Sequence, residues 1–264
     1  MSSIDALFER TRSENRAALV GYLPAGFPSK DLSIRAIETM VDAGVDLVEV
    51  GLPYSDPVMD GPTIQAAADV ALAGGTRIGD VFDVVKASAA TGAPTVVMTY
   101  WNPVERYGVE RFAADLAAAG GAGLITPDMT PDEAEEWISA STAQGLSRVF
   151  LVAPSSTDER LAMTAEAASG FVYATAVMGV TGQREQTSNL APELVARLRE
   201  VTDKPVGVGL GVSNGAQAHE VAAFADAVIV GSALVRCLLD HDEPDDALAA
   251  LRALVVDLRA GVER

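Results

Sequence analysis

Hydrophobic positions recur along the chain as short runs rich in valine, isoleucine and leucine. Each run is followed by a loop rich in glycine, proline and aspartate, and then by an alanine-rich stretch of helical periodicity. Alternating strands and helices predict a parallel sheet, and eight such units in 264 residues favour a closed barrel over an open sheet. The predicted strands are residues 19–23, 47–51, 95–99, 123–126, 148–152, 171–174, 206–209 and 227–230.

The intervals between these strands carry the helical pattern. The predicted helices are residues 33–43, 63–73, 109–119, 132–143, 158–168, 192–201 and 217–224. Further helices are expected at 4–14, 78–90 and 247–258. No internal boundary or low-complexity segment is visible. The expected fold is therefore an α/β, single (β/α)8 TIM barrel domain over residues 1–264, with an extra N-terminal helix and extra helices after strands two and eight.

Charge and hydropathy narrow the possible partners. Thirty-seven acidic residues against nineteen basic ones give a net charge of −18, which repels nucleic acid and anionic membrane surfaces. The longest apolar runs are far shorter than the roughly 20 residues that cross a bilayer. Residues 1–16 match neither a secretory signal nor a transit peptide. We therefore expect a cytoplasmic protein with neither nucleic acid nor membrane as a partner.

In a barrel of this kind the reacting groups lie at the carboxyl ends of the strands. The lysines are expected in helices or before a strand, which argues against a Schiff base. The two histidines fall in or beside outer helices, so neither a His/Cys metal site nor a Ser-His pair is expected. The only cysteine is expected to be buried in a helix. The lysines are Lys30, Lys86 and Lys204, the histidines are His219 and His241, and the cysteine is Cys237. Carboxylates remain as the candidate reacting groups.

Glu49 is the unusual residue of the second strand, because it interrupts an otherwise apolar run. Parallel strands are buried on both faces, so a glutamate there must be paired, neutralised or functional. Burial would raise its pKa and suit a group that both gives and takes protons near neutral pH. A structural acid that is hydrogen-bonded to a neighbouring hydroxyl or amide is the alternative.

The loop that follows, residues 52–63, carries three prolines among the residues that lead into the next helix. Asp60 stands ahead of Gly61 and Pro62, so both a catalytic role and a turn or capping role fit it. Asp56 lies in a Ser-Asp-Pro turn, where a structural role is favoured.

Glycines follow the last three strands, at residues 179–182, 209–213 and 231–233. The loops after strands seven and eight are the usual phosphate site of this fold, where backbone N–H groups and a helix N-terminus hold the anion. A single glycine pair is weak evidence, but three consecutive strand ends together predict a phosphate site.

Residues 48–65, with the sequence VEVGLPYSDPVMDGPTIQ, resemble in order and spacing the signature of the tryptophan synthase alpha subunit family. The resemblance extends through Tyr100-Trp101-Asn102-Pro103, residues 179–182 and both terminal glycine sites, and so covers nearly the whole chain. It implies retro-aldol cleavage of indole-3-glycerol phosphate to indole and glyceraldehyde 3-phosphate.

The same resemblance implies roles for individual residues. Glu49 would move protons at indole C3 and the adjacent hydroxyl, Asp60 would hold or polarise the indole N–H, and Tyr173 would lie near the reacting side chain. For Tyr173, strand packing is the alternative. The residues expected to bind the indole substrate are Tyr22, Met98, Tyr100 and Thr181. The residues expected to bind phosphate are Gly182, Gly211, Gly231 and Ser232.

Three positions depart from the family pattern. Some relatives carry an arginine at the position of Val177, and phenylalanine is common where Tyr22 and Tyr54 stand. The contacts that close the loop after the sixth strand must therefore differ from those in such relatives. The hydroxyls of the two tyrosines also need hydrogen-bond partners.

Family resemblance also implies a partner. The chain itself would hold no cofactor, and indole would pass to a beta subunit that carries pyridoxal phosphate, in an α2β2 heterotetramer. The loop 53–60 and Asp128 are plausible contacts with that subunit. Two other functions stay open. One is a different phosphate-binding barrel enzyme, for instance a sugar-phosphate isomerase or epimerase, although an epimerase would need metal ligands that the histidines do not supply. The other is a non-catalytic activator, which would need neither Glu49 nor Asp60.

Overall fold

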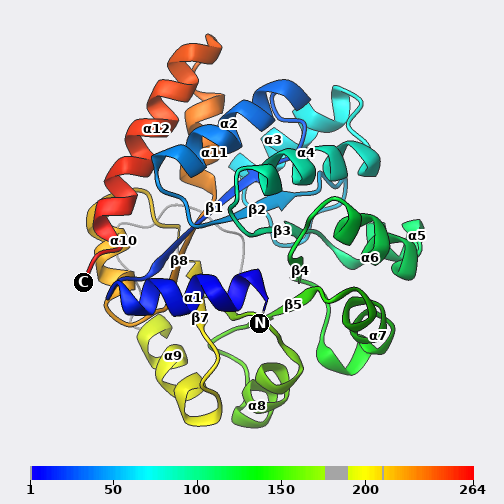
Figure 1. The fold of residues 1–264 in the computed structure, drawn as a ribbon, viewed down its shortest axis with the longest axis vertical. Coiled ribbons are helices and arrows are strands. Elements are labelled where there is room, and N and C mark those ends of the chain that lie inside the picture. The colour runs from blue at the N-terminus through cyan, green and yellow to red at the C-terminus, as the bar shows by residue number, and fades with distance from the viewer. Residues whose placement is uncertain (1, 176–189, 210) are drawn as a thin grey trace.

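The structure is a computed structural model that describes residues 2–175, 190–209 and 211–264. Its strands pair in parallel in sequence order, and β1 also pairs with β8, so the sheet closes into a barrel (Figure 1). The strands are β1 (Ala18–Pro24), β2 (Leu47–Gly51), β3 (Thr95–Met98), β4 (Gly123–Thr126), β5 (Ser147–Val152), β6 (Val172–Thr175), β7 (Val206–Gly209) and β8 (Ala227–Val230).

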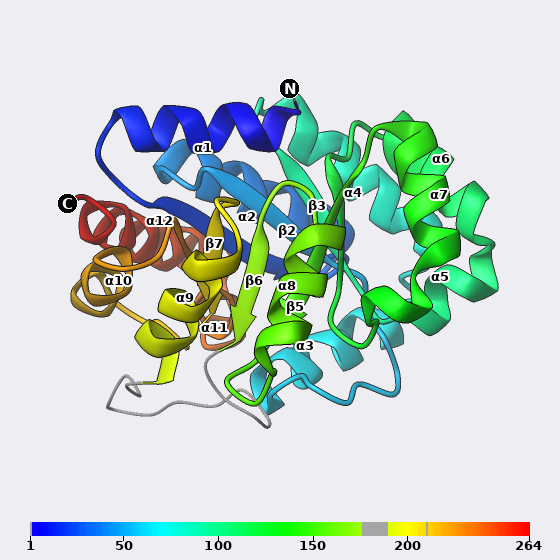
Figure 2. The same ribbon diagram turned by 90° about the horizontal axis from the view of Figure 1, so that it is seen from below.

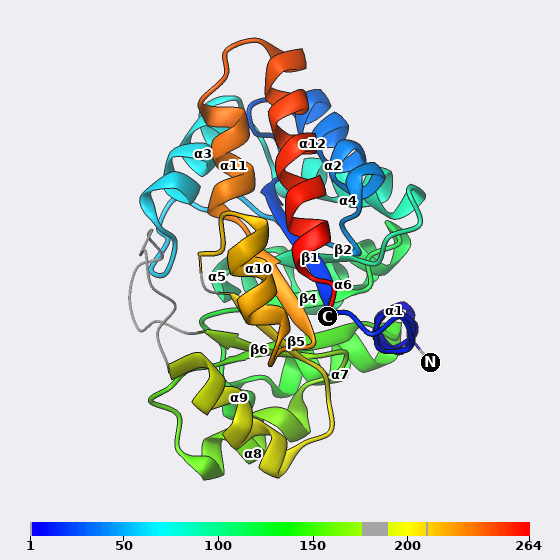
Figure 3. The ribbon, with the colours of Figure 1, turned by 90° about the vertical axis from the view of Figure 1, so that its left-hand side faces the viewer.

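Helices surround the barrel (Figure 1). They are α1 (Ser3–Ser13), α2 (Lys30–Ala43), α3 (Pro62–Ala73), α4 (Ile78–Ala90), α5 (Trp101–Tyr107), α6 (Val109–Ala118), α7 (Glu135–Gln144), α8 (Asp158–Ala167), α9 (Leu190–Val201), α10 (Gly215–Ala222), α11 (Ser232–Leu239) and α12 (Pro244–Gly261). Helix α12 packs against α2, α10 and α11 on one side of the barrel (Figure 3). The TIM barrel is confirmed, and so are the N-terminal helix and the additional helices after β2 and β8. Among the described residues, no helix combines the length and the apolar character needed to cross a membrane.

Side-chain alternation along the strands divides the core into two layers. In β2, Leu47 packs inside the barrel, whereas Val48 and Val50 pack outward against the helices. Glu49 therefore points into the barrel, one layer above Leu47. The inner layer is closed by large side chains such as Phe171 and Ile229. Because side chains alternate along the strand, the acid that interrupts the apolar run of β2 lies inside the barrel.

Helix α1 covers the amino-terminal end of the barrel (Figure 2). Ile4, Leu7 and Phe8 join the inner apolar layer, and the Phe8 ring lies 5.8 Å from that of Phe171 between centroids. The N-terminal extension therefore closes the end opposite to the one at which the strands finish.

A buried ion pair fixes the start of the barrel at the same end. Two nitrogens of the Arg16 guanidinium donate to the two carboxylate oxygens of Asp46, at 2.6 and 2.8 Å. One of those oxygens also accepts the Leu19 backbone N–H at 2.9 Å. The pair therefore joins the residue just before β2 to the beginning of β1.

Apart from shifts of up to three residues at the ends of elements, three features differ from the sequence prediction. Helix α5 was not predicted, because seven residues with a proline in the first turn carry too little periodicity. Predicted helix 132–143 is a 3-10 turn, Pro131–Glu133, followed by α7. Cys237 lies on α11 as expected but is only partly buried.

Candidate active site

Glu49 lies at the centre of the candidate site. Only 1% of its surface is exposed, and its Oε1 atom is buried without a hydrogen-bond partner in the part of the chain that the structure describes. Burial alone raises the pKa of this carboxyl from 4.5 to about 8. The glutamate is therefore mostly protonated at neutral pH. The alternative of a structural acid hydrogen-bonded to a neighbouring hydroxyl or amide gains no support from Oε1, which has no such partner among the described residues.

Two tyrosines flank Glu49 inside the barrel. Tyr22 is in register with Glu49 on β1, and its ring occupies the space above Gly51, where a Cβ atom would lie 2.3 Å from the hydroxyl. Tyr173 on β6 reaches over Gly209 in the same way, with 2.5 Å to its hydroxyl. The Glu49 charge contributes to raising the pKa of both tyrosines, after the larger effect of burial. Glycines at the ends of β2 and β7 thus make room for these rings.

Asp60 comes from the loop between β2 and α3. Its backbone carbonyl accepts a hydrogen bond from the Gln65 side chain at 2.7 Å. Partial burial raises the pKa of its carboxyl, and a hydrogen bond with the Tyr100 hydroxyl opposes that rise. After burial, the charge of Asp60 raises the pKa of Tyr22 most, followed by the charge of Glu49. Tyr22 therefore lies within the electrostatic reach of both acids.

Met98 and Tyr100 lie at the end of β3. Met98 is partly buried and packs against the inner layer of the barrel, as Tyr173 does. Tyr100 is 5% exposed, and its hydroxyl accepts the Met59 backbone N–H at 2.9 Å. These two side chains therefore lie on the same rim as the acids, as the sequence predicted.

Carboxyl ends of β7 and β8 carry the predicted phosphate residues. Gly211 has a φ of 69°, the left-handed region that favours glycine, and a Cβ atom there would meet open space. Gly231 and Ser232 begin α11, where no side chain caps the first turn. Such a helix start presents free N–H groups to an anion. Two further predicted residues, Thr181 and Gly182, lie outside the described residues.

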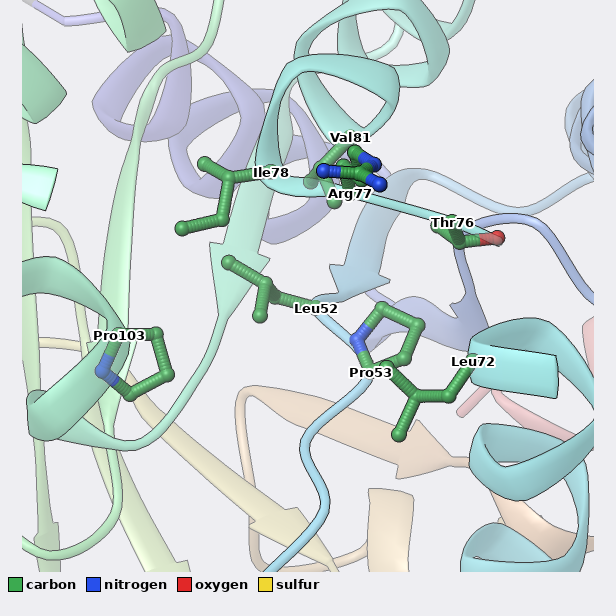
Figure 4. Close-up of a pocket in the computed structure, with 8 residues that line it drawn as sticks. All are labelled: Leu52, Pro53, Leu72, Thr76, Arg77, Ile78, Val81 and Pro103. Atoms are coloured by element: carbon green, nitrogen blue, oxygen red, sulfur yellow. The ribbon is translucent and has the colours of Figure 1, made fainter. Parts of the chain in front are cut away.

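A separate cavity of about 190 Å³ lies between the loop after β2 and the helices α3, α4 and α5 (Figure 4). No carboxylate lines it, and Arg77 is its one charged side chain. Its walls are Leu52, Pro53, Leu72, Thr76, Arg77, Ile78, Val81 and Pro103. It is therefore distinct from the site around Glu49.

Sequence reasoning missed the contacts that connect neighbouring loops at this rim. Asn102 donates to the Tyr54 hydroxyl at 3.0 Å, and the Tyr54 and Tyr100 rings lie 5.4 Å apart between centroids. Asp128 accepts the Trp101 backbone N–H at 3.0 Å. The motif around Asn102 was the available signal, but a motif alone does not say which loop it contacts.

Fold and site together define a (β/α)8-barrel protein whose candidate reacting groups are carboxylates at the carboxyl ends of the strands. Among the residues that the structure describes, no group of three or more His, Cys, Asp or Glu side chains could hold a metal ion. A family model described as tryptophan synthase alpha chain matches residues 8–263. The chain belongs to the tryptophan synthase alpha chain family.

Individual relatives agree with this assignment. A tryptophan synthase alpha chain from Salinispora arenicola is 64% identical over 262 residues, which cover 99% of this chain and 98% of the relative. A structure of Mycobacterium tuberculosis tryptophan synthase is similar with a TM-score of 0.94 at 56% identity, covering 100% of this chain and 99% of the other. An alpha subunit from Legionella pneumophila has a TM-score of 0.88 at 32% identity, covering 99% of this chain and 98% of that one.

Proposed function

We propose that this chain cleaves indole-3-glycerol phosphate to indole and glyceraldehyde 3-phosphate, as the alpha subunit of a tryptophan synthase. The observation that carries the proposal is Glu49, a buried acid with a free oxygen at the mouth of a barrel of this family. A side chain so placed destabilises the fold, so a functional role is the expected reason for its presence.

Glu49 supplies the proton transfers in this proposal. With a pKa of about 8 it starts protonated at neutral pH and gives its proton to C3 of the indole ring. The resulting indolenine can accept electrons from the carbon–carbon bond. The ionised glutamate then takes the proton of the side-chain hydroxyl, the bond breaks, and the products are indole and the aldehyde. The glutamate ends protonated, ready for the next substrate.

Asp60 accepts a hydrogen bond from the indole N–H and stabilises the positive charge that develops on the ring. Its role requires the ionised form, in contrast to that of Glu49. Tyr22, Met98 and Tyr100 form the apolar walls that hold the ring, and Tyr173 lies beside the glycerol side chain. Their positions on β1, β3 and β6 around Glu49 support these roles.

Gly211, Gly231 and Ser232 bind the phosphate through backbone N–H groups and the start of α11. The uncapped first turn of that helix supports this role. Such a site allows a protein of net charge −18 to hold an anion, because the attraction is local. Thr181 and Gly182 complete the substrate and phosphate sites in the proposal.

The partner in this proposal is a beta subunit that holds pyridoxal phosphate and receives the indole, in an α2β2 complex. Similarity to a structure of tryptophan synthase from Mycobacterium tuberculosis in its aminoacrylate-bound form supports it, at 54% identity. The chain would act in the cytoplasm as a single barrel domain without a cofactor of its own.

Indole release from indole-3-glycerol phosphate tests the function. We expect Glu49→Gln and Asp60→Asn each to lower kcat by at least about 100-fold, the usual effect of removing a general acid or a charge-stabilising group. Glu38→Gln, which removes the same charge from an exposed position of α2, is the matched control and should keep full activity. Full activity of Glu49→Gln would overturn the proposed chemistry. If the wild-type chain releases no indole, alone or with a beta subunit, the proposed function is wrong. The non-catalytic activator and another barrel enzyme then remain as possible functions.

A further inference from the structure

Two hydrogen bonds to one side chain hold the chain just after the predicted phosphate residue Gly211. The Oε1 atom of Gln217, in the first turn of α10, accepts the Ser213 backbone N–H at 2.8 Å. The same atom accepts a hydrogen bond from the Ser213 hydroxyl at 3.0 Å. Ser213 and Gln217 are both half-buried. Since a serine residue has only these two donors, Gln217 uses both of them.

We propose that Gln217 is a positioning residue for the phosphate site: it fixes the peptide group of Ser213, so that Gly211, two residues earlier, presents its backbone N–H to the phosphate of the substrate. The inference rests on the proposed function and deepens it. Gln217 was expected only as the first residue of a helix, so this role is additional to helix formation.

Ser213 would otherwise be an obvious phosphate ligand, because its hydroxyl follows the glycine of the phosphate site so closely. While its proton is donated to Gln217, the hydroxyl can only accept, and a phosphate dianion needs donors. Gly211 is exposed, whereas Val212 is 3% exposed and belongs to the outer layer of the core. The donor that this segment offers to an anion is therefore the exposed backbone N–H of Gly211.

Gln217 is itself held in place at the start of α10. The Asn214 side chain accepts the Gln217 backbone N–H at 3.0 Å and so caps the helix. The Gly215 N–H donates to the Asp257 carboxylate of α12 at 2.6 Å. A Cβ atom on Gly215 would lie only 2.5 Å from the Asp257 carbonyl oxygen, so the first turn of α10 packs directly on α12 (Figure 3). The Gln217 side chain therefore reaches Ser213 from a rigid element.

Gln217→Met keeps the length of the side chain and removes the amide oxygen. Glycerol 3-phosphate, a small phosphate monoester, is the probe, and titration followed by ³¹P NMR gives its Kd. We expect the Kd to rise at least about fivefold, the effect of losing about one hydrogen bond. The KM for indole-3-glycerol phosphate should rise by a similar factor. The kcat at saturation should change little, because the phosphate takes no part in breaking the carbon–carbon bond.

Two variants separate positioning from other roles of this segment. Ser213→Ala removes the hydroxyl bond and keeps the backbone bond, so its effect on the Kd should be smaller than that of Gln217→Met. Asn214→Ala removes the cap of α10 and should lower the Tm, but it leaves both bonds to Ser213 and should bind the ester as the wild type does.

Three results overturn the positioning role: an unchanged Kd in Gln217→Met, a larger loss in Ser213→Ala, which makes the hydroxyl a direct ligand, or an equal loss in Asn214→Ala, which makes the effect a general loosening of α10. The titration needs no turnover, so the two failures are distinguishable. If the wild type binds the ester but releases no indole, the proposed reaction is wrong, and weaker binding by Gln217→Met still supports the positioning role. If the wild type binds no ester, the phosphate site and this inference are both wrong.

Discussion

Replacing Glu49 by glutamine should stabilise the protein, and increasingly so as the pH rises. Wild-type Glu49 has a pKa of about 8 in the folded chain, against 4.5 as its ordinary value. Below pH 4.5 the residue is mostly neutral in both the folded and the unfolded chain, so its charge does not lower the free energy of unfolding. Between the two values the unfolded chain loses the proton and the folded chain keeps it, so the free energy of unfolding falls as the pH rises. Glutamine does not titrate, so the free energy of unfolding of Glu49→Gln lacks this dependence on pH.

The size of the effect follows from the two pKa values. At about 1.4 kcal/mol for each tenfold change, the wild type loses about 3 kcal/mol between pH 5 and pH 8 relative to Glu49→Gln. Glu49 is only 1% exposed, so solvent screening does not reduce this figure. For a domain of this size the difference corresponds to roughly 6–12 °C in Tm.

Thermal unfolding of both proteins from pH 5 to pH 8, followed by circular dichroism, measures the difference. The change with pH is the informative quantity, because any fixed cost of burying the amide cancels. Glu38→Gln on the exposed face of α2 reports the effect of net charge alone. A Tm difference between wild type and Glu49→Gln that stays constant over this range would refute the reasoning.

Three further substitutions test other parts of the structure. Gly51→Ala places a Cβ atom 2.3 Å from a tyrosine hydroxyl of β1, so kcat/KM for cleavage should fall at least about tenfold in steady-state assays; unchanged kinetics would contradict this. Gly211→Ala strains a φ of 69° at the predicted phosphate site and should raise KM several-fold, whereas Gly75→Ala, equally strained at 87° but distant, should not. Equal KM values for these two variants would argue against the phosphate site. Arg16→Met leaves Asp46 buried without its main partner and should cost about 3 kcal/mol in urea unfolding, while kcat at low temperature is preserved; a loss below about 1 kcal/mol would contradict it.

The strands were predictable nearly to the residue, because a parallel strand in a barrel is an apolar run bounded by loops. β2, β4, β7 and β8 have the predicted bounds, and β6 is shifted by one residue. Helix starts were less predictable, since they depend on caps. Helix α2 begins at Lys30, three residues before its predicted start, because the Ser29 side chain accepts the Leu32 N–H.

Glu49 was recognisable from the sequence alone, because the strand period sends every second side chain inward and an acid there is conspicuous. The environment of Asp60 was not recognisable in this way. Beside it, the Tyr100 hydroxyl accepts the Met59 N–H and so joins residues 41 positions apart on two loops, and each loop has to be placed before the contact exists. Sequence patterns report periodicity within an element, whereas loop-to-loop contacts depend on the register of β2 against β3.

Glu49 and Asp60 illustrate how one barrel rim can place two carboxyls in different environments. Glu49 belongs to a strand, so the fold imposes burial on it, and among the described residues its Oε1 has no hydrogen-bond partner that would favour the charged form. Asp60 belongs to a loop and is only partly buried; burial still raises its pKa, and the hydroxyl of Tyr100 opposes that rise. In the proposed reaction Glu49 gives a proton and Asp60 accepts a hydrogen bond from the indole N–H. That reaction requires two acids in different environments, rather than merely two acids.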